Sequence, residues 1–262
     1  MKYVCHSMRM MLRCATQYRA SFLLQTLGQL IMTAGDLMAV LVLMNRFAHV
    51  GQWQPDEILV FFGVMQLSFS LTECFGRGIT SFDQMIRNGQ FDCLMLRPRS
   101  LLLQVVCSAL DPRRLITSLV GLAAVWAGFT RLGLSWSAER VILLVLSVTG
   151  GTFLLLGLFL IAAAVVFFSV RSIEMLNVLT YGGRSACQYP ADIYPGPLRV
   201  LFTWVAPFVV CMQLPVSVML GKPLLPVGFG GACAAPLMGV AFFLLMSRLW
   251  YVGARHYRST GS

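Results

Sequence analysis

Long apolar runs alternate along this 262-residue chain with short polar segments in which arginine is frequent. The hydrocarbon core of a bilayer is about 30 Å thick, and a helix of roughly 20 apolar residues crosses it. The pattern predicts a membrane-spanning helix in each of five runs, at residues 21–47, 57–79, 113–129, 141–170 and 227–252. We therefore expect an all-α integral membrane protein.

The composition agrees with this pattern. Apolar residues make up 58% of the chain, charged residues only 11%, and the mean hydropathy is +0.76. Such values are typical of membrane proteins. The length leaves room for about six spans and for no separate soluble catalytic domain.

A sixth span must come from residues 171–222, where two layouts compete. In one, residues 198–220 cross the membrane after a cytoplasmic loop at 172–197. In the other, residues 173–189 form a short span, and residues 190–222 enter the bilayer from the outer side and return. Prolines favour the second layout, because each removes a backbone hydrogen bond and broken backbone does not face lipid. They are Pro190, Pro195, Pro197, Pro207 and Pro215. A single span kinked at Pro207 is the alternative.

The two ends of the chain flank this six-helix membrane domain, which covers residues 21–252. Residues 1–20 are expected to form an amphipathic interfacial helix, since one stripe at helical spacing is apolar and the other is basic. A cytosolic helix packed on its own protein is the alternative. The arginines in this stretch argue against a cleaved signal peptide. Residues 253–262 are expected to form a cytoplasmic tail.

Positive charge predicts the orientation, because Lys and Arg collect on the side of a membrane that is not translocated. With the second layout, fourteen of the 20 Lys and Arg residues fall on one side and six on the other. The smaller group is Arg46, Arg131, Arg140, Arg184, Arg199 and Lys222. Both termini are therefore expected in the cytoplasm, and topology explains the net charge of +10 without a nucleic-acid partner.

No catalytic or metal-binding pattern occurs in the sequence. GxxxxGK[ST], HExxH and GxSxG are absent, and the eight cysteines form no CxxC pair. We therefore predict no catalytic residue, no metal site and no cofactor bound by this chain. Cys187 and Cys211 are candidates for a disulfide on the outer side, and the other cysteines are expected to pack as small apolar residues.

Charged residues within the predicted spans are candidate functional residues, because a charge at the centre of a membrane helix costs about 2.5–3.5 kcal/mol on insertion scales. Asp36 and Glu73 are in this position. They are expected either to line a substrate path or to pair with an arginine, and Arg113, Arg114 and Arg184 are the candidate partners. Pairing is the simpler role, because neither acid lies in a row such as a proton relay needs.

The polar segment at residues 81–100, between the second and third spans, is cytoplasmic by the charge count. Gly89 is expected to end one short helix in the left-handed conformation. Phe91, Leu94 and Met95 then give the next turn an apolar face, and Pro98 ends it. A short amphipathic helix of this kind suits docking of a soluble partner, and an interfacial helix without a partner is the alternative.

Two motifs at this separation resemble those of a known family. The first, G-x-F-D-x-x-L-x-R-P, is matched here by Gly89, Phe91, Asp92, Met95, Arg97 and Pro98, with methionine where leucine is usual. The second, Y-P-x-x-I-Y-P followed by P-F and P-x-x-x-x-L-G, is matched by Tyr189, Pro190, Ile193, Tyr194, Pro195, Pro207, Phe208, Pro215, Leu220 and Gly221. Over nearly its whole length the chain resembles the permease subunit of a type 2 ATP-binding-cassette (ABC-2) exporter.

The resemblance implies an interfacial N-terminal helix, a loop at 81–100 that contacts the ATPase, and an extracytoplasmic re-entrant hairpin at 190–222. It also implies a bacterial plasma-membrane protein that works with a second, related permease chain or a copy of itself. Two P-loop ATPase subunits would bind ATP and Mg²⁺. Lipid, hydrophobic drug, peptide and sugar polymer all stay open as substrates.

The implied mechanism is alternating access to a cavity between two permease chains. The residues expected to line it are Asp36, Phe69, Glu73, Asn177 and Tyr181, and the small residues Gly182 and Gly183 would permit close helix approach. A self-sufficient secondary carrier or an intramembrane enzyme is the alternative function. A carrier, however, is expected to show broken helices in both halves, and only the second half of this chain has one.

Overall fold

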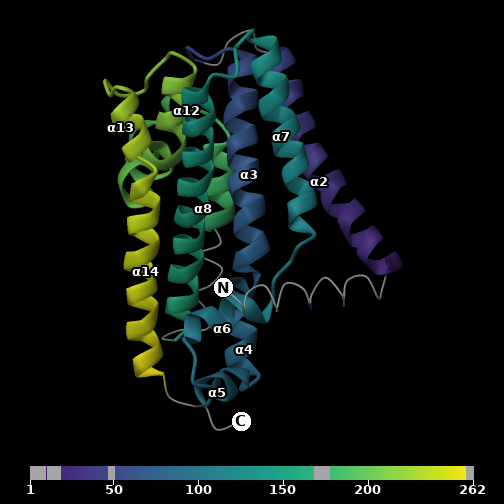
Figure 1. Cartoon of the computed structure of the whole chain (residues 1–262), viewed down its shortest axis with the longest axis vertical. Helices are drawn as coiled ribbons and strands as arrows, with labels where there is room; N and C mark the ends of the chain where they lie inside the picture. Colours follow the sequence, from purple (N-terminus) through teal and green to yellow (C-terminus); the bar gives the residue numbers. More distant parts are fainter. Residues whose placement is uncertain (1–9, 11–18, 47–50, 168–177, 258–262) are drawn as a thin grey trace.

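The computed structural model describes residues 10, 19–46, 51–167 and 178–257. Within these residues all the regular elements are helices, joined by short loops, and there is no strand. There are five long helices, α2 (Arg19–Arg46), α3 (Pro55–Thr80), α7 (Arg114–Arg131), α8 (Ala138–Val166) and α14 (Leu237–His256). Four of them run roughly side by side, while α2 slants away from them (Figure 1). The bounds of the first four lie within about one turn of the predicted spans, whereas the last predicted span, 227–252, is divided into α13 (Phe229–Ala234) and α14. The prediction of an all-α protein is confirmed.

Local sequence explains where two of these helices begin. Pro55 occupies the first position of α3, where its missing N–H is not needed, and the Gln54 backbone N–H donates to Glu57 Oε2 at 2.8 Å. At the start of α8, the Ser137 hydroxyl accepts a hydrogen bond from the Arg140 backbone N–H at 3.4 Å. Such caps satisfy N–H groups that have no partner within the helix.

Helix α3 lies at the centre of the bundle, between α7 and α8 (Figure 1). Glycines permit this close packing: a Cβ built on Gly121 would lie 3.0 Å from the Gly63 carbonyl oxygen of α3. The same holds where α8 meets α14, because a Cβ on Gly239 would lie 2.2 Å from the Gly150 carbonyl oxygen. Small residues at these crossings are what allow membrane helices to approach closely.

Three short helices gather at the lower end of the bundle in Figure 1. They are α4 (Phe82–Arg87), α5 (Gln90–Met95) and α6 (Leu101–Ser108). An aromatic cluster fixes α5 to the bundle, because the Phe91 ring lies 5.8 Å from Phe167, 6.3 Å from Trp250 and 5.1 Å from Tyr257. This loop is therefore part of the packed core.

The proline-rich region forms a series of short helical segments. They are η2 (Val178–Gly182), α10 (Gly183–Cys187), η3 (Ala191–Ile193), α11 (Gly196–Val200), η4 (Leu201–Val205), η5 (Val209–Gln213) and α12 (Leu214–Met219). The path bends by 78° between Gly196–Val205 and Val209–Met219. Pro207 lies at the bend, as expected for a residue that cannot continue a helix.

Both ends of this region contact the same short stretch before α3. Asp192 accepts a hydrogen bond from the Gln52 side chain at 2.9 Å, and the Lys222 ammonium donates to the Gln52 carbonyl oxygen at 3.2 Å and to Glu57 Oε2 at 2.8 Å. Phe167, by contrast, lies in the aromatic cluster at the opposite end of the bundle. Phe167 and Asp192 thus lie at opposite ends of the bundle, whereas Asp192 and Lys222 lie at the same end.

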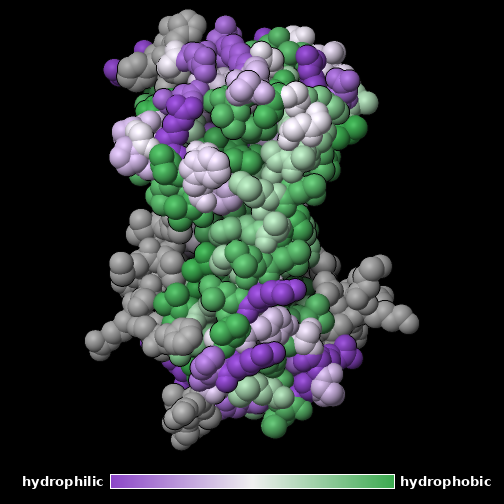
Figure 2. All heavy atoms as spheres, turned by 90° about the vertical axis from the view of Figure 1, so that its left-hand side faces the viewer, coloured by the Kyte–Doolittle hydropathy of each residue, from purple (hydrophilic) through white to green (hydrophobic). Residues whose placement is uncertain are grey.

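The surface has the distribution expected for a membrane protein. Figure 2 shows a hydrophobic belt between two more polar ends, over the face that carries α13 (Phe229–Ala234) and α14. By length and composition, four helices of the described residues can cross a membrane, or five if the bent pair counts as one span. The 18-residue α7 is not among them, and the count of six spans stays a prediction.

The two ends of the chain are only partly described. The predicted interfacial helix at 1–20 lies outside the described residues except for Met10, Arg19 and Ala20, and Arg19 already begins α2. At the other end α14 continues to His256, one turn beyond the predicted end of the span. The rest of the predicted tail beyond Tyr257 lies outside the described residues.

Candidate functional site

A cavity of about 410 Å³ lies between α2, α3, α7 and α10. Its lining residues are Gln25, Gly28, Gln29, Met32, Thr33 and Asp36 of α2, Gln66, Phe69 and Glu73 of α3, Arg114 and Thr117 of α7, and Arg184 of α10. Three residues expected to line a cavity, Asp36, Phe69 and Glu73, thus face the same space. Tyr181 packs edge-on against Phe69 with ring centroids 5.8 Å apart, and Asn177 lies outside the described residues.

One face of α2 supplies half of the cavity wall. Its lining residues follow each other at intervals of three and four, which places them on one side of a helix. The opposite side is apolar and exposed, and it holds Leu23, Leu24, Leu27, Ile31, Met38 and Val42. The Thr33 hydroxyl donates to the Gln29 carbonyl at 2.9 Å within the helix. Helix α2 is therefore amphipathic, with its polar face directed at the cavity.

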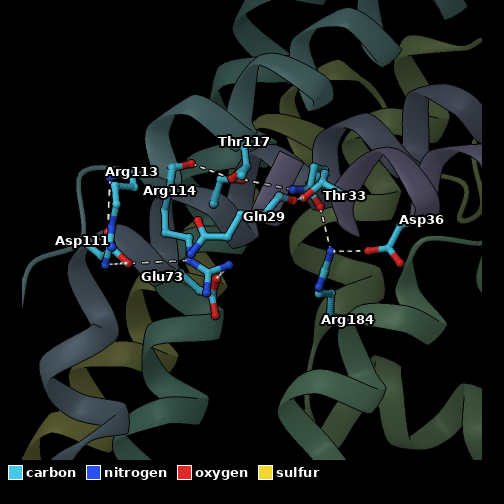
Figure 3. A network of polar contacts seen from close by, with 11 residues as sticks. Gln29, Thr33, Asp36, Glu73, Asp111, Arg113, Arg114, Thr117 and Arg184 are labelled. Carbon is cyan, nitrogen blue, oxygen red and sulfur yellow. Dashed lines mark hydrogen bonds and ion pairs between the residues drawn. The ribbon is translucent and has the colours of Figure 1, made fainter. Parts of the chain in front are cut away.

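Arg184 carries one of the two positive charges at the cavity. It donates to Asp36 Oδ2 at 3.0 Å and to Gln66 Oε1 at 2.9 Å, and its guanidinium lies 4.2 Å from the centre of the Phe69 ring. The arginine side chain is only 18% exposed, whereas that of Asp36 is 46% exposed. Figure 3 shows this pair reaching across from α10 to α2.

Arg114 carries the second positive charge and pairs with Glu73. It also lies 4.0 Å from Asp111, which is buried and accepts two hydrogen bonds from the Arg113 side chain at 2.7 and 3.1 Å. Arg113 in turn donates to the Gln25 side chain of α2. Asp111, Arg113 and Arg114, at the start of α7, therefore form one network with the cavity (Figure 3).

Hydroxyl and amide groups continue the polar wall between the two arginines. The Ser70 and Thr117 hydroxyls lie 3.1 Å apart, and the Gln66 amide donates to Ser70 at 3.3 Å. The sequence analysis did not select Gln66, Ser70 or Thr117. Their signal was available, because Gln66, Ser70 and Glu73 are spaced like one face of a helix inside an apolar run.

Of the two roles considered for Asp36 and Glu73, the structure shows arginine pairing for both. The partners are Arg184 and Arg114, both named as candidates by the sequence. The acids also face the cavity, so pairing and lining are not exclusive. A role of either residue in a substrate path stays a prediction.

The segment at residues 81–100 has the expected glycine turn but a different apolar face. Gly89 adopts φ +66°, the left-handed conformation predicted for it. Phe91 is buried in the aromatic cluster and Leu94 is partly buried. The expected docking face would need both side chains to point outward, and neither does. The exposed apolar side chains of this segment are instead Met95, at 42%, and Leu96, at 87%. The inward turn of Phe91 follows from its aromatic neighbours on α4 and α14.

The polar residues of this segment divide in the same way. Arg97 and Pro98 are exposed at its surface. Asp92 lies beside Tyr257, and burial together with this carboxylate raises the pKa of the Tyr257 phenol. Asp92 therefore contacts the end of α14, while Arg97 remains available at the surface.

In the proline-rich region a buried glutamine, Gln213, joins η5 to the turn at residues 187–191. The sequence analysis did not select it. Gln213 donates to the Tyr189 carbonyl at 2.8 Å and to the Cys187 carbonyl at 3.3 Å, and it accepts from the Ala191 N–H at 2.9 Å. The Tyr194 hydroxyl donates to the Ala186 carbonyl at 2.8 Å. These bonds satisfy backbone groups that the prolines leave outside regular helices.

Other predictions for this region have mixed outcomes. Pro190, Pro207 and Pro215 are buried, and Pro195 is exposed. Cys187 and Cys211 are both buried free thiols, so the candidate disulfide is not formed. A Cβ on Gly183 would lie 3.0 Å from the Phe208 ring, so this glycine makes room for the chain's own proline-rich region. No cluster of metal-ligating residues occurs among the described residues.

These features define a multi-pass helical membrane protein with a charged cavity inside its bundle. A family model described as "ABC-2 family transporter protein" matches residues 30–261, and the chain belongs to this family. Its role is that of a permease, the membrane component of an ABC transporter. No curated protein and no solved structure matches the chain.

Proposed function

We propose that this chain is the permease subunit of an ABC exporter, in which separate ATPase subunits drive transport. With a second permease chain, related to it or identical, it would form an alternating-access path for a lipid, hydrophobic drug, peptide or similar substrate. The family match over residues 30–261 is the observation that carries this proposal. The charged cavity beside α2 supports it, because polar groups inside a membrane bundle mark substrate pathways.

The segment at residues 81–100 is proposed to dock the ATPase. Met95 and Leu96 are apolar and exposed at its surface, beside the exposed Arg97. An apolar contact with a charged neighbour suits a protein interface. Because Phe91 fixes α5 to α4 and α14, a movement of the docked ATPase would be passed directly to the long helices.

Residues 190–222 are proposed to form a re-entrant hairpin on the outer side, with both termini in the cytoplasm. Asp192 and Lys222 both contact Gln52, which supports entry and return at one end of the bundle. The charge asymmetry between the two sides of the membrane supports the orientation. The plasma membrane of a bacterium is the proposed location.

The docking proposal is tested with the double variant Met95→Asp and Leu96→Asp. We expect it to release the ATPase from the purified complex, or to uncouple ATP hydrolysis from transport, while the permease stays folded. Leu225→Asp is the matched control, because Leu225 is 41% exposed in a loop far from this segment. Co-purification and substrate-stimulated hydrolysis are measured for both.

An unchanged complex with unchanged hydrolysis in the double variant would contradict docking through this segment. If the chain also transported without any ATPase, the alternative of a self-sufficient carrier would be supported instead. Phe91 is unsuitable for this test, because its buried side chain makes a loss of folding indistinguishable from a loss of docking.

A further inference from the structure

The two walls of the cavity carry unequal charge. The packed part of the bundle contributes Arg114 and Arg184 against Glu73, so that two positive charges less one negative charge leave a formal +1. The other wall is α2, whose one charged lining residue is Asp36. The packed wall alone is therefore complementary to a single negative charge, and Asp36 supplies it.

Asp36 lies where another anion could replace it as the partner of Arg184. Helix α2 packs against α3 and α7 far less extensively than α3, α7, α8 and α14 pack against one another, so it is the more loosely held wall of the cavity. The Asp36 side chain is 46% exposed, whereas Arg184 is 18% exposed and fixed by Gln66 and Phe69. The buried arginine always needs a counter-ion, but the half-exposed aspartate can leave for water.

The arginines also keep unused hydrogen-bond donors. Among the described residues, the Nε–H groups of Arg114 and Arg184 are buried without a hydrogen-bond partner. Asp36 bonds only a terminal nitrogen of Arg184. A guanidinium presents its donors as a fork that matches two oxygens of one anionic group. An anion with several oxygens would therefore satisfy Arg184 more completely than Asp36 does.

Apolar groups adjoin this charged site. Met32 and Phe69 line the same cavity, and the outer face of α2 is apolar. We propose that the cavity binds the anionic head group of an amphiphile, a carboxylate, sulfate or phosphate joined to an apolar tail. Asp36 occupies this place on Arg184 when no ligand is bound. The inference rests on the proposed permease function and names the class of substrate.

The test uses the purified full chain in phosphatidylcholine nanodiscs, titrated with dodecyl phosphate while its melting temperature is followed. We expect a saturable rise. Dodecyltrimethylammonium, dodecyl maltoside and inorganic phosphate are the comparison ligands, and none of them is expected to give it. An equal response to inorganic phosphate would contradict the claim that the ligand needs an apolar tail. A preference for the ammonium compound would contradict the claim that its head group is anionic.

Two variants are expected to change the binding of dodecyl phosphate in opposite directions. Arg184→Gln removes the binding group and is expected to abolish the response to dodecyl phosphate. Asp36→Asn removes the internal competitor and is expected to lower the apparent Kd for dodecyl phosphate by about tenfold. Asp56→Asn is the matched control and is expected to behave as wild type, because Asp56 pairs with Arg131 away from the cavity. Equal weakening in Asp36→Asn and Arg184→Gln would show a structural pair and overturn the proposal.

Asp36→Asn leaves Arg184 without its counter-ion, so this variant can fail to fold. In that event dodecyl phosphate present during extraction is expected to restore a monodisperse protein, and dodecyltrimethylammonium is not. Failure of dodecyl phosphate to restore it would contradict the proposal that an anionic head group replaces Asp36 on Arg184. Because no ATPase takes part, this result is independent of the docking experiment.

Discussion

At the scale of single residues, side chains that the sequence pattern places on one apolar face differ in how deeply they are buried. Phe91 and Met95 belong to the same six-residue helix, yet Phe91 is fully buried and Met95 is 42% exposed. The aromatic residues around Phe91 come from α4, from Phe167 and from the end of α14, positions far apart in the sequence. A helical pattern read locally cannot reveal such a contact.

Phe91→Ala is expected to destabilise the protein by about 3–5 kcal/mol, because it removes a large buried ring and leaves a cavity. Met95→Ala is the control and is expected to change stability by less than about 0.5 kcal/mol. Unfolding in a mild detergent, followed by circular dichroism, measures both. Similar stabilities for the two variants would contradict the burial of Phe91.

Glu73→Gln is expected to destabilise the protein by about 1–3 kcal/mol, since Arg114 then keeps only the more distant Asp111, at 4.0 Å, as a counter-ion. The double variant Glu73→Gln with Arg114→Gln is expected to recover most of this loss. The yield of monodisperse protein and its melting temperature measure the effect. A Glu73→Gln variant as stable as wild type would mean that the carboxylate contributes little as a counter-ion.

At the scale of helices, the long apolar runs were sufficient to predict both ends of α2, α3, α7 and α8 within about one turn, but not the division of the last run into α13 and α14. Helix length in a membrane is set by the bilayer, so composition alone carries that information. The contacts between helices were not predictable in the same way. Gln213, for example, bonds a turn about 25 residues earlier. The sequence also named three candidate arginines for Asp36 but could not choose Arg184, which lies 148 residues away.

The crossing of α8 and α14 depends on glycine. Gly239→Ala is expected to destabilise the protein by about 1–3 kcal/mol, because its Cβ would meet the Gly150 backbone and overpack the crossing. Gly230→Ala is the control, since nothing lies within 4 Å of its Cβ position. Thermal melting of both variants checks this, and equal melting temperatures would contradict the close crossing.

The re-entrant hairpin predicts that two exposed positions, Ile193 and Leu225, lie on the outer side. Cysteines placed there singly are expected to react with an impermeant thiol reagent in intact cells, and a cysteine at Leu96 only after permeabilisation. The background retains only the buried Cys74, Cys107, Cys187 and Cys211. Labelling of Ile193→Cys only after permeabilisation would favour one span across residues 198–220.

At the scale of the whole molecule, the two ends of the bundle differ in a way that fits a driven transporter. One end carries the short helices with Met95 and Leu96 exposed, and the other holds the contacts among Gln52, Asp192 and Lys222. The cavity lies between α2 and the packed helices. Binding at one end can therefore alter the cavity through α3, which runs from one end to the other.

The central claim is that this chain transports only with an ATPase, and the most direct measurement is ATP hydrolysis by the purified chain alone and after co-expression with P-loop ATPases of the same cell. We predict that the chain alone neither binds nor hydrolyses ATP. With its partner we predict a stable complex, containing two permease and two ATPase subunits by native mass spectrometry, that hydrolyses ATP. Hydrolysis by the chain alone, or transport with every P-loop ATPase absent, would contradict the claim.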